Sequence, residues 1–388
     1  MFFAVTLGIS VMPIMEQQHI LHSLKGSSLW RIAEKVLSAE RLSYEDIVDL
    51  FLSPDLNVVG YLANTVRERM HQTNTYYIRN QHINYTNICN KHCQFCFFAK
   101  NPKDGGPTPY LMSMVDVENA IQNHMNVPIT EVHIVGGINP KLPFTYYLDL
   151  LRTVKRVRPE VHIKAFTAVE IVEIARVADM SIKDTLIALK DAGLDSVPGG
   201  GAEVLSDRVH DLAHPRKIGP NEWEDVAREI AKAGLPQYST MLYGHVETIE
   251  ERAEHLVRLR KLQDETGHFL AFTPLSFHPE GTYWDHLSAP TGDDDLRIIA
   301  VSRLALDNFP HIKSFWIMNT AAVSQISLWY GADDIDGTVH EYEITYPEGH
   351  IGQKRQILTR PQLISMIREA GRTPIERDSF YQIVSKES

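Results

Sequence analysis

Three cysteines in one short segment are the residues of this chain whose spacing most clearly indicates chemistry. Cys89, Cys93 and Cys96 follow the pattern C-x₃-C-x₂-C and are the only cysteines among 388 residues. Cysteine thiolates are the usual ligands of iron–sulfur clusters. Three thiolates can bind three corners of a four-iron cluster, and the fourth iron then keeps an open coordination position. The spacing therefore predicts a [4Fe-4S] cluster that takes part in a reaction.

Two other interpretations of the cysteines fit less well. A structural zinc ion almost always has four protein ligands. His92 could supply one of them, but the chain has no second C-x₂-C pair. An electron carrier would be better served by a fourth cysteine, because a carrier gains nothing from an open iron. Clustered cysteines in a long chain also indicate a reducing compartment, and we expect the protein to be cytoplasmic.

The elements that position the cysteines follow a repeating pattern from about residue 77 onward. Short β-branched runs alternate with amphipathic stretches, which is typical of βαβ units and a parallel sheet. This number of repeats predicts a (β/α) barrel, complete or partial TIM-type, with catalytic residues at the carboxyl ends of its strands. The predicted strands are 82–87, 131–135, 161–166, 195–197, 238–243, 269–273 and 312–317, with a weak eighth at 334–336. The predicted helices are 115–125, 143–157, 181–192, 221–234, 248–266, 291–308 and 320–329.

The chain divides into three predicted parts. Residues 1–76 form a leader and a helical preamble, 77–340 form the barrel, and 341–388 form a C-terminal appendage packed on the barrel. The apolar opening, 1–14, has no basic residue before it and is too short to span a bilayer. We expect a leader or an over-long translation start. Capping boxes begin helices after Ser43 and after Thr248.

Composition and charge exclude several classes of partner. Apolar residues make up 44% of the chain and charged residues 22%, as in globular proteins. The net charge of −11 argues against binding to nucleic acid. We expect no membrane partner.

The cysteine loop, with Phe95 before its last cysteine, resembles the cluster loop of the radical S-adenosylmethionine enzymes. This resemblance implies a [4Fe-4S] cluster whose open iron is chelated by S-adenosylmethionine. It also implies an external one-electron reductant such as flavodoxin or ferredoxin. Reduction then cleaves the sulfonium and yields a 5′-deoxyadenosyl radical, while the protein positions and shields the reacting groups.

The same resemblance implies residues that bind S-adenosylmethionine. Gly136 and Gly137 end the second predicted strand and match a glycine motif that binds the amino group, although glycine is also the default turn residue. Glu203 is placed to hold ribose hydroxyls, or it is simply a carboxylate at a helix N-terminus. Glu247 belongs to an element near the adenine. The implied cofactor-binding residues are Phe95, Gly136, Gly137, Glu170, Glu203 and Glu247.

Several longer segments narrow the resemblance to the aminofutalosine synthases. They are the runs 162–170, 198–203, 241–248 and 277–280. This resemblance covers roughly residues 80 to 345. It implies that the adenosyl radical adds to 3-[(1-carboxyvinyl)oxy]benzoate, a small aromatic dicarboxylate, with rearrangement and decarboxylation. The product is 6-amino-6-deoxyfutalosine in menaquinone biosynthesis, and S-adenosylmethionine is consumed as a co-substrate. The alternative is a hydrogen-abstracting relative such as dehypoxanthine futalosine cyclase.

Strand alternation predicts which polar residues face the substrate. In the third strand His162, Lys164 and Phe166 are expected to point into the barrel, and in the second strand His133 is. Lys164 is either a ligand of a substrate carboxylate or the partner of Glu170 or another acid. His245 and His278, at strand ends, are candidates to bind a carboxylate or to shuttle a proton. A lone histidine in such a place is more often structural.

Overall fold

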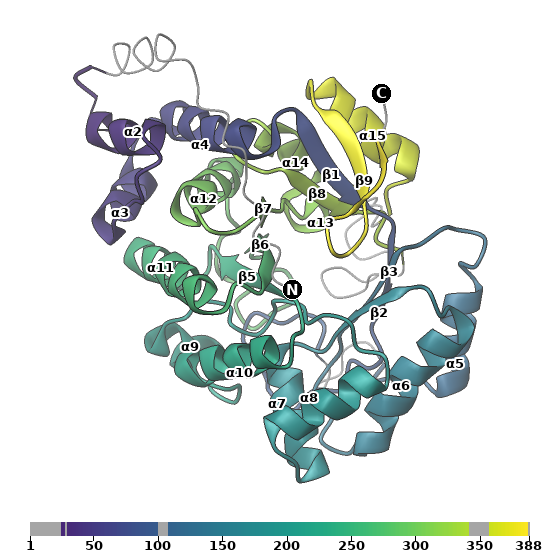
Figure 1. The fold of residues 1–388 in the computed structure, drawn as a ribbon. Helices are drawn as coiled ribbons and strands as arrows, with labels where there is room; N and C mark the ends of the chain where they lie inside the picture. The colour runs from purple at the N-terminus through teal and green to yellow at the C-terminus, as the bar shows by residue number, and fades with distance from the viewer. Residues whose placement is uncertain (1–24, 28, 100–107, 341–356, 387–388) are drawn as a thin grey trace.

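A computed structural model describes residues 25–27, 29–99, 108–340 and 357–386 (Figure 1). The barrel prediction is confirmed, because parallel strands surround a common interior with helices outside. The first group of parallel strands is β2 (Asn80–Ile83), β3 (Glu131–Ile134) and β4 (His162–Ala165). The second is β5 (Gln237–Tyr243), β6 (Phe269–Ser276) and β7 (His311–Ile312). A third sheet has the order β10 (Ile383–Lys386), β9 (Thr373–Arg377), β1 (Asn74–Ile78) and β8 (Asp334–Gly337).

Isolated bridges continue the parallel pairing from one sheet to the next. Lys164 pairs with Ser196 and Val197 with Gln237, which connects β4 to β5. Lys313 pairs with Asp334, and further along the chain His340 pairs with Gln81 of β2. The interior of the barrel is therefore bounded by strands on all sides, and their carboxyl ends share one rim.

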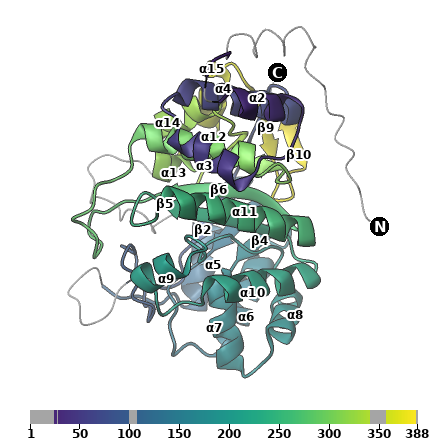
Figure 2. The same cartoon turned by 90° about the vertical axis from the view of Figure 1, so that its left-hand side faces the viewer.

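Helices cover the outside of the barrel (Figures 1 and 2). After the preamble helices α2 (Trp30–Leu37), α3 (Tyr44–Leu52) and α4 (Leu56–His71), the outer helices are α5 (Met114–Gln122), α6 (Phe144–Val157), α7 (Ala168–Ala178), α8 (Ile182–Asp191), α9 (Asp207–Ala213), α10 (Pro220–Lys232), α11 (Ile249–Thr266), α12 (Gly292–Ala305), α13 (Trp316–Asn319), α14 (Ala321–Ser327) and α15 (Arg360–Glu369). Apolar strand residues such as Val132, Ile134 and Ile163 are fully buried. The capping boxes at Ser43 and Thr248 are both confirmed.

Two predicted strands differ from the structure, and several elements were not predicted. The run 195–197 makes only bridges, because it is held between two longer strands. The strand expected at 312–317 ends at Ile312, and the chain turns into the short helix α13 at Trp316, whose indole donates to the Gly337 carbonyl. Helices α7 and α9 and strands β1, β9 and β10 were not predicted.

The C-terminal segment adds strands to the sheet that contains β1. Tyr76 is in register with Ile375 in the parallel pair of β1 and β9, and β10 runs antiparallel to β9. Ser379 of this segment reaches the barrel, where its hydroxyl donates to Glu131. The division of the chain at 76/77 and 340/341 stays a prediction. The predicted leader lies outside the described residues.

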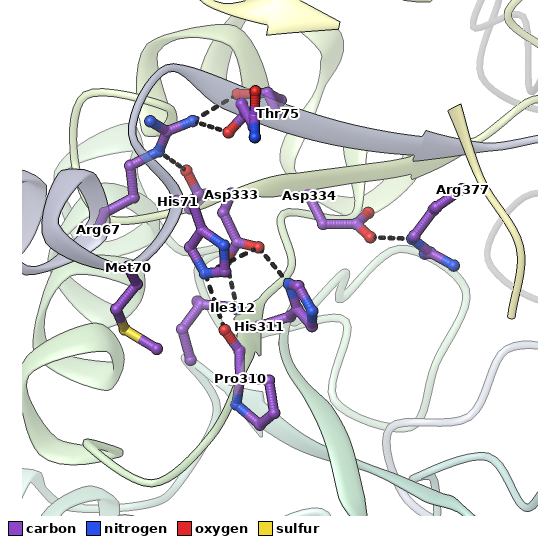
Figure 3. A network of polar contacts seen from close by, with 12 residues as sticks. Arg67, Met70, His71, Thr75, Pro310, His311, Ile312, Asp333, Asp334 and Arg377 are labelled. Atoms are coloured by element: carbon purple, nitrogen blue, oxygen red, sulfur yellow. Dashed lines mark hydrogen bonds and ion pairs between the residues drawn. The ribbon is translucent and has the colours of Figure 1, made fainter. Parts of the chain in front are cut away.

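A network around Asp333 joins α4, β7 and β8 at the amino ends of the strands (Figure 3). The Asp333 carboxylate accepts from Arg303, from the Ile312 amide at 2.8 Å and from His311 Nδ1 at 2.5 Å. His71 Nε2 donates to the Pro310 carbonyl at 2.9 Å. His311 Nδ1 and His71 Nε2 therefore each carry a proton. This buried cluster is a hydrogen-bonded network and not a set of free metal ligands.

Removal of the Asp333 carboxylate tests whether this network stabilises the fold. Arg303 is fully buried, so Asp333→Ala leaves an unpaired buried guanidinium. We expect the free energy of unfolding to fall by about 3–5 kcal/mol. Chemical denaturation measures this loss. Glu229→Ala, which removes an exposed ion pair to Lys232, is the matched control and should cost less than about 1 kcal/mol. Equal losses in the two variants would contradict the assignment.

The lowered pKa values of buried histidines make the stability of the fold depend on pH. Burial lowers the pKa of His71, His214 and His255 to about 3 each. The unfolded pKa is about 6.5, so below that pH the unfolded chain binds protons that the folded chain does not. The free energy of unfolding should therefore fall as the pH falls from about 6.5, by up to about 1.4 kcal/mol per pH unit for each such histidine.

His255→Gln isolates one of these protons. His255 Nδ1 accepts from the Leu205 amide at 3.0 Å, and a glutamine oxygen can replace that acceptor without titrating. Denaturation midpoints measured between about pH 6.5 and about pH 5 should fall less steeply in the variant. Parallel curves for the variant and the unaltered chain would contradict this prediction.

Candidate active site

A cavity of about 340 Å³ lies inside the barrel and opens among the carboxyl ends of the strands. Its wall includes residues from all sides of the barrel and from the loop that follows β2. One part of the wall contains the three cysteines and the glycine turns at the strand ends. The other part contains charged and polar residues that project from within the strands. We call these the cysteine end and the charged end.

All three cysteines line the cavity at the cysteine end. The loop is held in place by its backbone, because Asn90 N donates to the Ile138 carbonyl at 3.0 Å and Gln94 N to the Ala213 carbonyl at 2.8 Å. Burial raises the pKa of the Cys93 thiol to about 12 and also raises that of Cys96. A bound cation is therefore needed to keep these thiols ionised in this environment.

The spacing of the sulfurs distinguishes a cluster from a single ion. Two sulfurs on one zinc ion lie at most about 4.6 Å apart, because each Zn–S bond is about 2.3 Å. Among the described residues, the only set of three potential ligand atoms that all lie within 4.8 Å of one another is the buried group at Asp333. The three cysteine Sγ atoms do not form such a set, so their arrangement does not match that of a single zinc ion. His92 does not line the cavity. The donor set fits a multi-iron cluster with three protein ligands.

The glycine pair brings its backbone against the cysteine loop. A Cβ on Gly137 would lie 2.4 Å from the Ile88 carbonyl oxygen, and one on Gly136 would lie 2.7 Å from the Tyr85 ring. No larger residue fits at either position without a shift of its neighbours. Both glycines line the cavity, so their backbone is accessible to a ligand there.

Glu170 forms hydrogen bonds with residues at the carboxyl ends of three neighbouring strands. Its buried carboxylate accepts from the Tyr85 hydroxyl at 2.9 Å, from Gly136 N at 3.2 Å and from Thr167 N at 2.8 Å. The last contact is one half of a capping box that begins α7. Glu170 also lines the cavity, and burial raises the pKa of its carboxyl. It therefore fixes the ends of β2, β3 and β4 relative to one another. It does not pair with Lys164.

A second ion pair lies beside the cysteines. Glu203 and Lys217 both line the cavity, with Lys217 Nζ 2.6 Å from Glu203 Oε1 and 5.1 Å from the centre of the Phe95 ring. Burial alone would raise the pKa of Glu203, but the ammonium of Lys217 lowers it. Sequence reasoning found Glu203 and Phe95 and missed Lys217, because nothing in the segment after Pro215 indicated an inward lysine.

His245 and Glu247 are not brought to the cavity. His245 Nε2 donates to the Leu242 carbonyl at 3.0 Å, and its Nδ1 accepts from Val246 N at 2.8 Å. The Glu247 carboxylate accepts from Gly244 N, His245 N and Arg252. The polar atoms of both residues therefore form hydrogen bonds within or beside the turn after β5, which gives His245 and Glu247 a structural role. The His245 ring stacks near Phe95 at a centroid distance of 6.4 Å and so supports the cysteine loop from behind.

The charged end contains Lys164 and His133, which strand alternation predicted to point inward, and His278, expected at a strand end, also lines the cavity. Lys164 Nζ lies 2.6 Å from Glu131 Oε1, so its acidic partner is Glu131. His278 Nε2 donates to the Met318 carbonyl at 3.0 Å. Phe166, expected to point inward, packs edge-on against Tyr147 of α6 instead. Its φ of +59° breaks the alternation of the strand.

Comparison with known proteins agrees with this geometry. Residues 83–259 match the model of the radical SAM superfamily, and residues 266–387 match the CofH/MqnC C-terminal region. An aminodeoxyfutalosine synthase from Thermus thermophilus is 41% identical over 368 residues, which cover 94% of this chain and 98% of that protein. A cyclic dehypoxanthine futalosine synthase from Halalkalibacterium halodurans is 36% identical, with 91% and 94% covered. The crystal structure of a methylornithine synthase has a TM-score of 0.71 at 15% identity, with 88% and 96% covered.

The fold, the cysteine loop and these matches define a radical S-adenosylmethionine enzyme. Within that class the chain belongs to the CofH/MqnC-related family that includes the aminodeoxyfutalosine synthases. Enzymes of this class use a [4Fe-4S] cluster and S-adenosylmethionine, and the donor set described above fits both requirements. Among the described residues, no helix is long and apolar enough to cross a membrane.

Substitution within the cysteine loop tests the ligand assignment. Cys93→Ala should retain the barrel, measured by circular dichroism, but lose bound iron, sulfide and turnover, since two thiolates cannot hold the cluster. His92→Ala is the matched control in the same loop and should keep all three. Iron retained in Cys93→Ala, or a single zinc ion lost from His92→Ala, would refute the assignment.

Proposed function

We propose that the protein is an aminodeoxyfutalosine synthase. It transfers the 5′-deoxyadenosyl group of S-adenosylmethionine to the enol double bond of 3-[(1-carboxyvinyl)oxy]benzoate. Rearrangement and loss of carbon dioxide then give 6-amino-6-deoxyfutalosine for menaquinone biosynthesis. The observation that carries this proposal is a single cavity with three thiols at one end and buried cationic residues at the other. The identity to aminodeoxyfutalosine synthase over nearly the whole chain supports it.

The cysteine end would hold the cofactors. Cys89, Cys93 and Cys96 would each bind one iron, and the backbone of Gly136 and Gly137 would bind the amino group of S-adenosylmethionine. When bound, the cluster and S-adenosylmethionine supply one electron and the 5′-deoxyadenosyl radical, with an external carrier such as flavodoxin or ferredoxin as the source of the electron.

The ion pair of Glu203 and Lys217 offers the ribose hydroxyls both a hydrogen-bond acceptor and a hydrogen-bond donor. The Glu203 carboxylate accepts from hydroxyl groups, and the Lys217 ammonium donates to them while it neutralises the carboxylate. Phe95, whose ring centre lies 5.1 Å from Lys217 Nζ, lines the cavity at the same end. These groups hold the nucleoside in place without moving a proton.

The charged end would hold the acceptor. A dicarboxylate entering a buried cavity must have its charges met by donors, because unpaired buried charge is costly. Lys164 and His133 project from β4 and β3 toward such a ligand. His278 lines the same cavity and donates through Nε2 to the Met318 carbonyl. The enclosing barrel excludes water that would quench reactive species.

Product analysis under anaerobic conditions tests the proposal. Reconstituted and reduced protein with S-adenosylmethionine and 3-[(1-carboxyvinyl)oxy]benzoate should yield an adduct that contains both the adenosyl group and the aromatic ring, detected by mass spectrometry. Release of 5′-deoxyadenosine with unaltered acceptor would contradict it. Consumption of dehypoxanthine futalosine in a parallel reaction would favour the cyclase instead.

A further inference from the structure

Two lysines at the charged end face the same aromatic ring. Lys164 projects from β4, and Lys313 follows β7 on the opposite side of the barrel. Their Nζ atoms lie 4.6 Å and 5.6 Å from the centre of the Tyr238 ring. All three side chains line the cavity, and each of these residues is at most 5% exposed. Two ammonium groups are thus held beside one ring in a buried space.

Each lysine already has one acidic partner, and the two partnerships differ. Lys164 Nζ lies 2.6 Å from Glu131, whose other oxygen accepts from Ser379 at 2.8 Å. Lys313 Nζ lies 3.2 Å from Asp336, which itself lines the cavity. An ammonium has three N–H groups, so each lysine retains donors beyond its ion pair. The longer contact makes Lys313 the more available of the two.

His133 adds a third donor to this group. Its Nε2 is buried and makes no hydrogen bond to any described residue. The centre of its ring lies 4.6 Å from the centre of the His82 ring, so the two imidazoles pack against each other. A buried polar atom without a partner is costly, and a ligand that supplies one recovers that cost.

We infer that Lys313, Lys164 and His133 together bind the ring carboxylate of the aromatic dicarboxylate, with Lys313 as the specificity-determining residue. This inference rests on the proposed function. The enol double bond must lie toward the cysteine end, where the adenosyl group is delivered, and the carboxyvinyl carboxylate is attached directly to it. The ring carboxylate is the charge that remains to be bound at the far end. His133 lies three residues before Gly136 on β3, roughly 10 Å deeper in the barrel.

A charge-neutral variant isolates this contribution. Lys313→Met alone leaves Asp336 buried without its partner, so the informative variant is the double replacement Lys313→Met with Asp336→Asn. Lys313→Arg restores the positive charge. Lys155→Met is the matched control, because Lys155 makes a 2.7 Å ion pair with Asp195 on the outer side of the same barrel and does not line the cavity.

The measurement compares two ligands that differ by one carboxylate. Binding of 3-[(1-carboxyvinyl)oxy]benzoate and of 2-phenoxyacrylate, which lacks the ring carboxylate, is measured by calorimetry on cluster-loaded protein with S-adenosylmethionine. Unaltered protein and Lys155→Met should prefer the dicarboxylate by about 10- to 100-fold, the contribution of a charge-assisted hydrogen bond. In the double variant the preference should fall to within about threefold, and Lys313→Arg should restore part of it. Iron content and S-adenosylmethionine binding should be unchanged.

The outcomes separate this inference from the proposed function. The inferred carboxylate site is wrong if the double variant keeps the full preference for the dicarboxylate. It is also wrong if the affinity for both ligands falls by the same factor. If unaltered protein forms the adduct while the preference is independent of Lys313, the function stands and the site falls. If no adduct forms but the preference depends on Lys313, the carboxylate site stands and the proposed function falls.

Discussion

Charge inside this barrel is buried, and buried charge is stable only when it is paired. The interior meets this constraint with cross-strand ion pairs, in which Lys164 from β4 pairs with Glu131 from β3 and Arg377 from β9 pairs with Asp334 from β8. Each pair also fixes the register of the elements that supply it. These buried ion pairs are therefore part of what holds the barrel together.

The C-terminal segment belongs to the same arrangement. Ser379 donates to Glu131 and accepts a hydrogen bond at its carbonyl from the hydroxyl of Tyr238, so it holds the counter-ion of Lys164 and the ring beside it. At the opposite end of the cavity, Glu170 holds the turn at Gly136 and the start of α7. Structural residues thus place the cysteines and the lysines at a fixed separation. A reaction that joins two substrates within one cavity requires such a separation.

Much of this could be predicted from the sequence, because its local signals are strong. The cysteine spacing, the capping boxes and the alternating strands led to the barrel and to an inward Lys164 and His133. The same alternation applied to the seventh strand would have found Lys313. Helix α7 was not predicted, although Thr167 and Glu170 have the spacing of a capping box and form one at its start.

Other features depend on tertiary contacts that leave no local signal. Lys217 reaches Glu203 across fourteen residues, and β9 joins β1 from the far end of the chain. His245 and Glu247 occupy a strand end, where catalytic residues are expected. Their polar atoms nevertheless serve the turn itself. Position at the rim was therefore not sufficient to identify a functional residue.

The central claim is that three cysteines leave one iron open and that S-adenosylmethionine binds there. Electron–nuclear double resonance on the reduced cluster, with S-adenosylmethionine labelled with ¹⁵N at its amino group, tests it most directly. The account predicts a hyperfine coupling from the labelled nitrogen, which is lost together with the cluster in Cys93→Ala. A cluster signal that is unchanged by S-adenosylmethionine and shows no nitrogen coupling would contradict it.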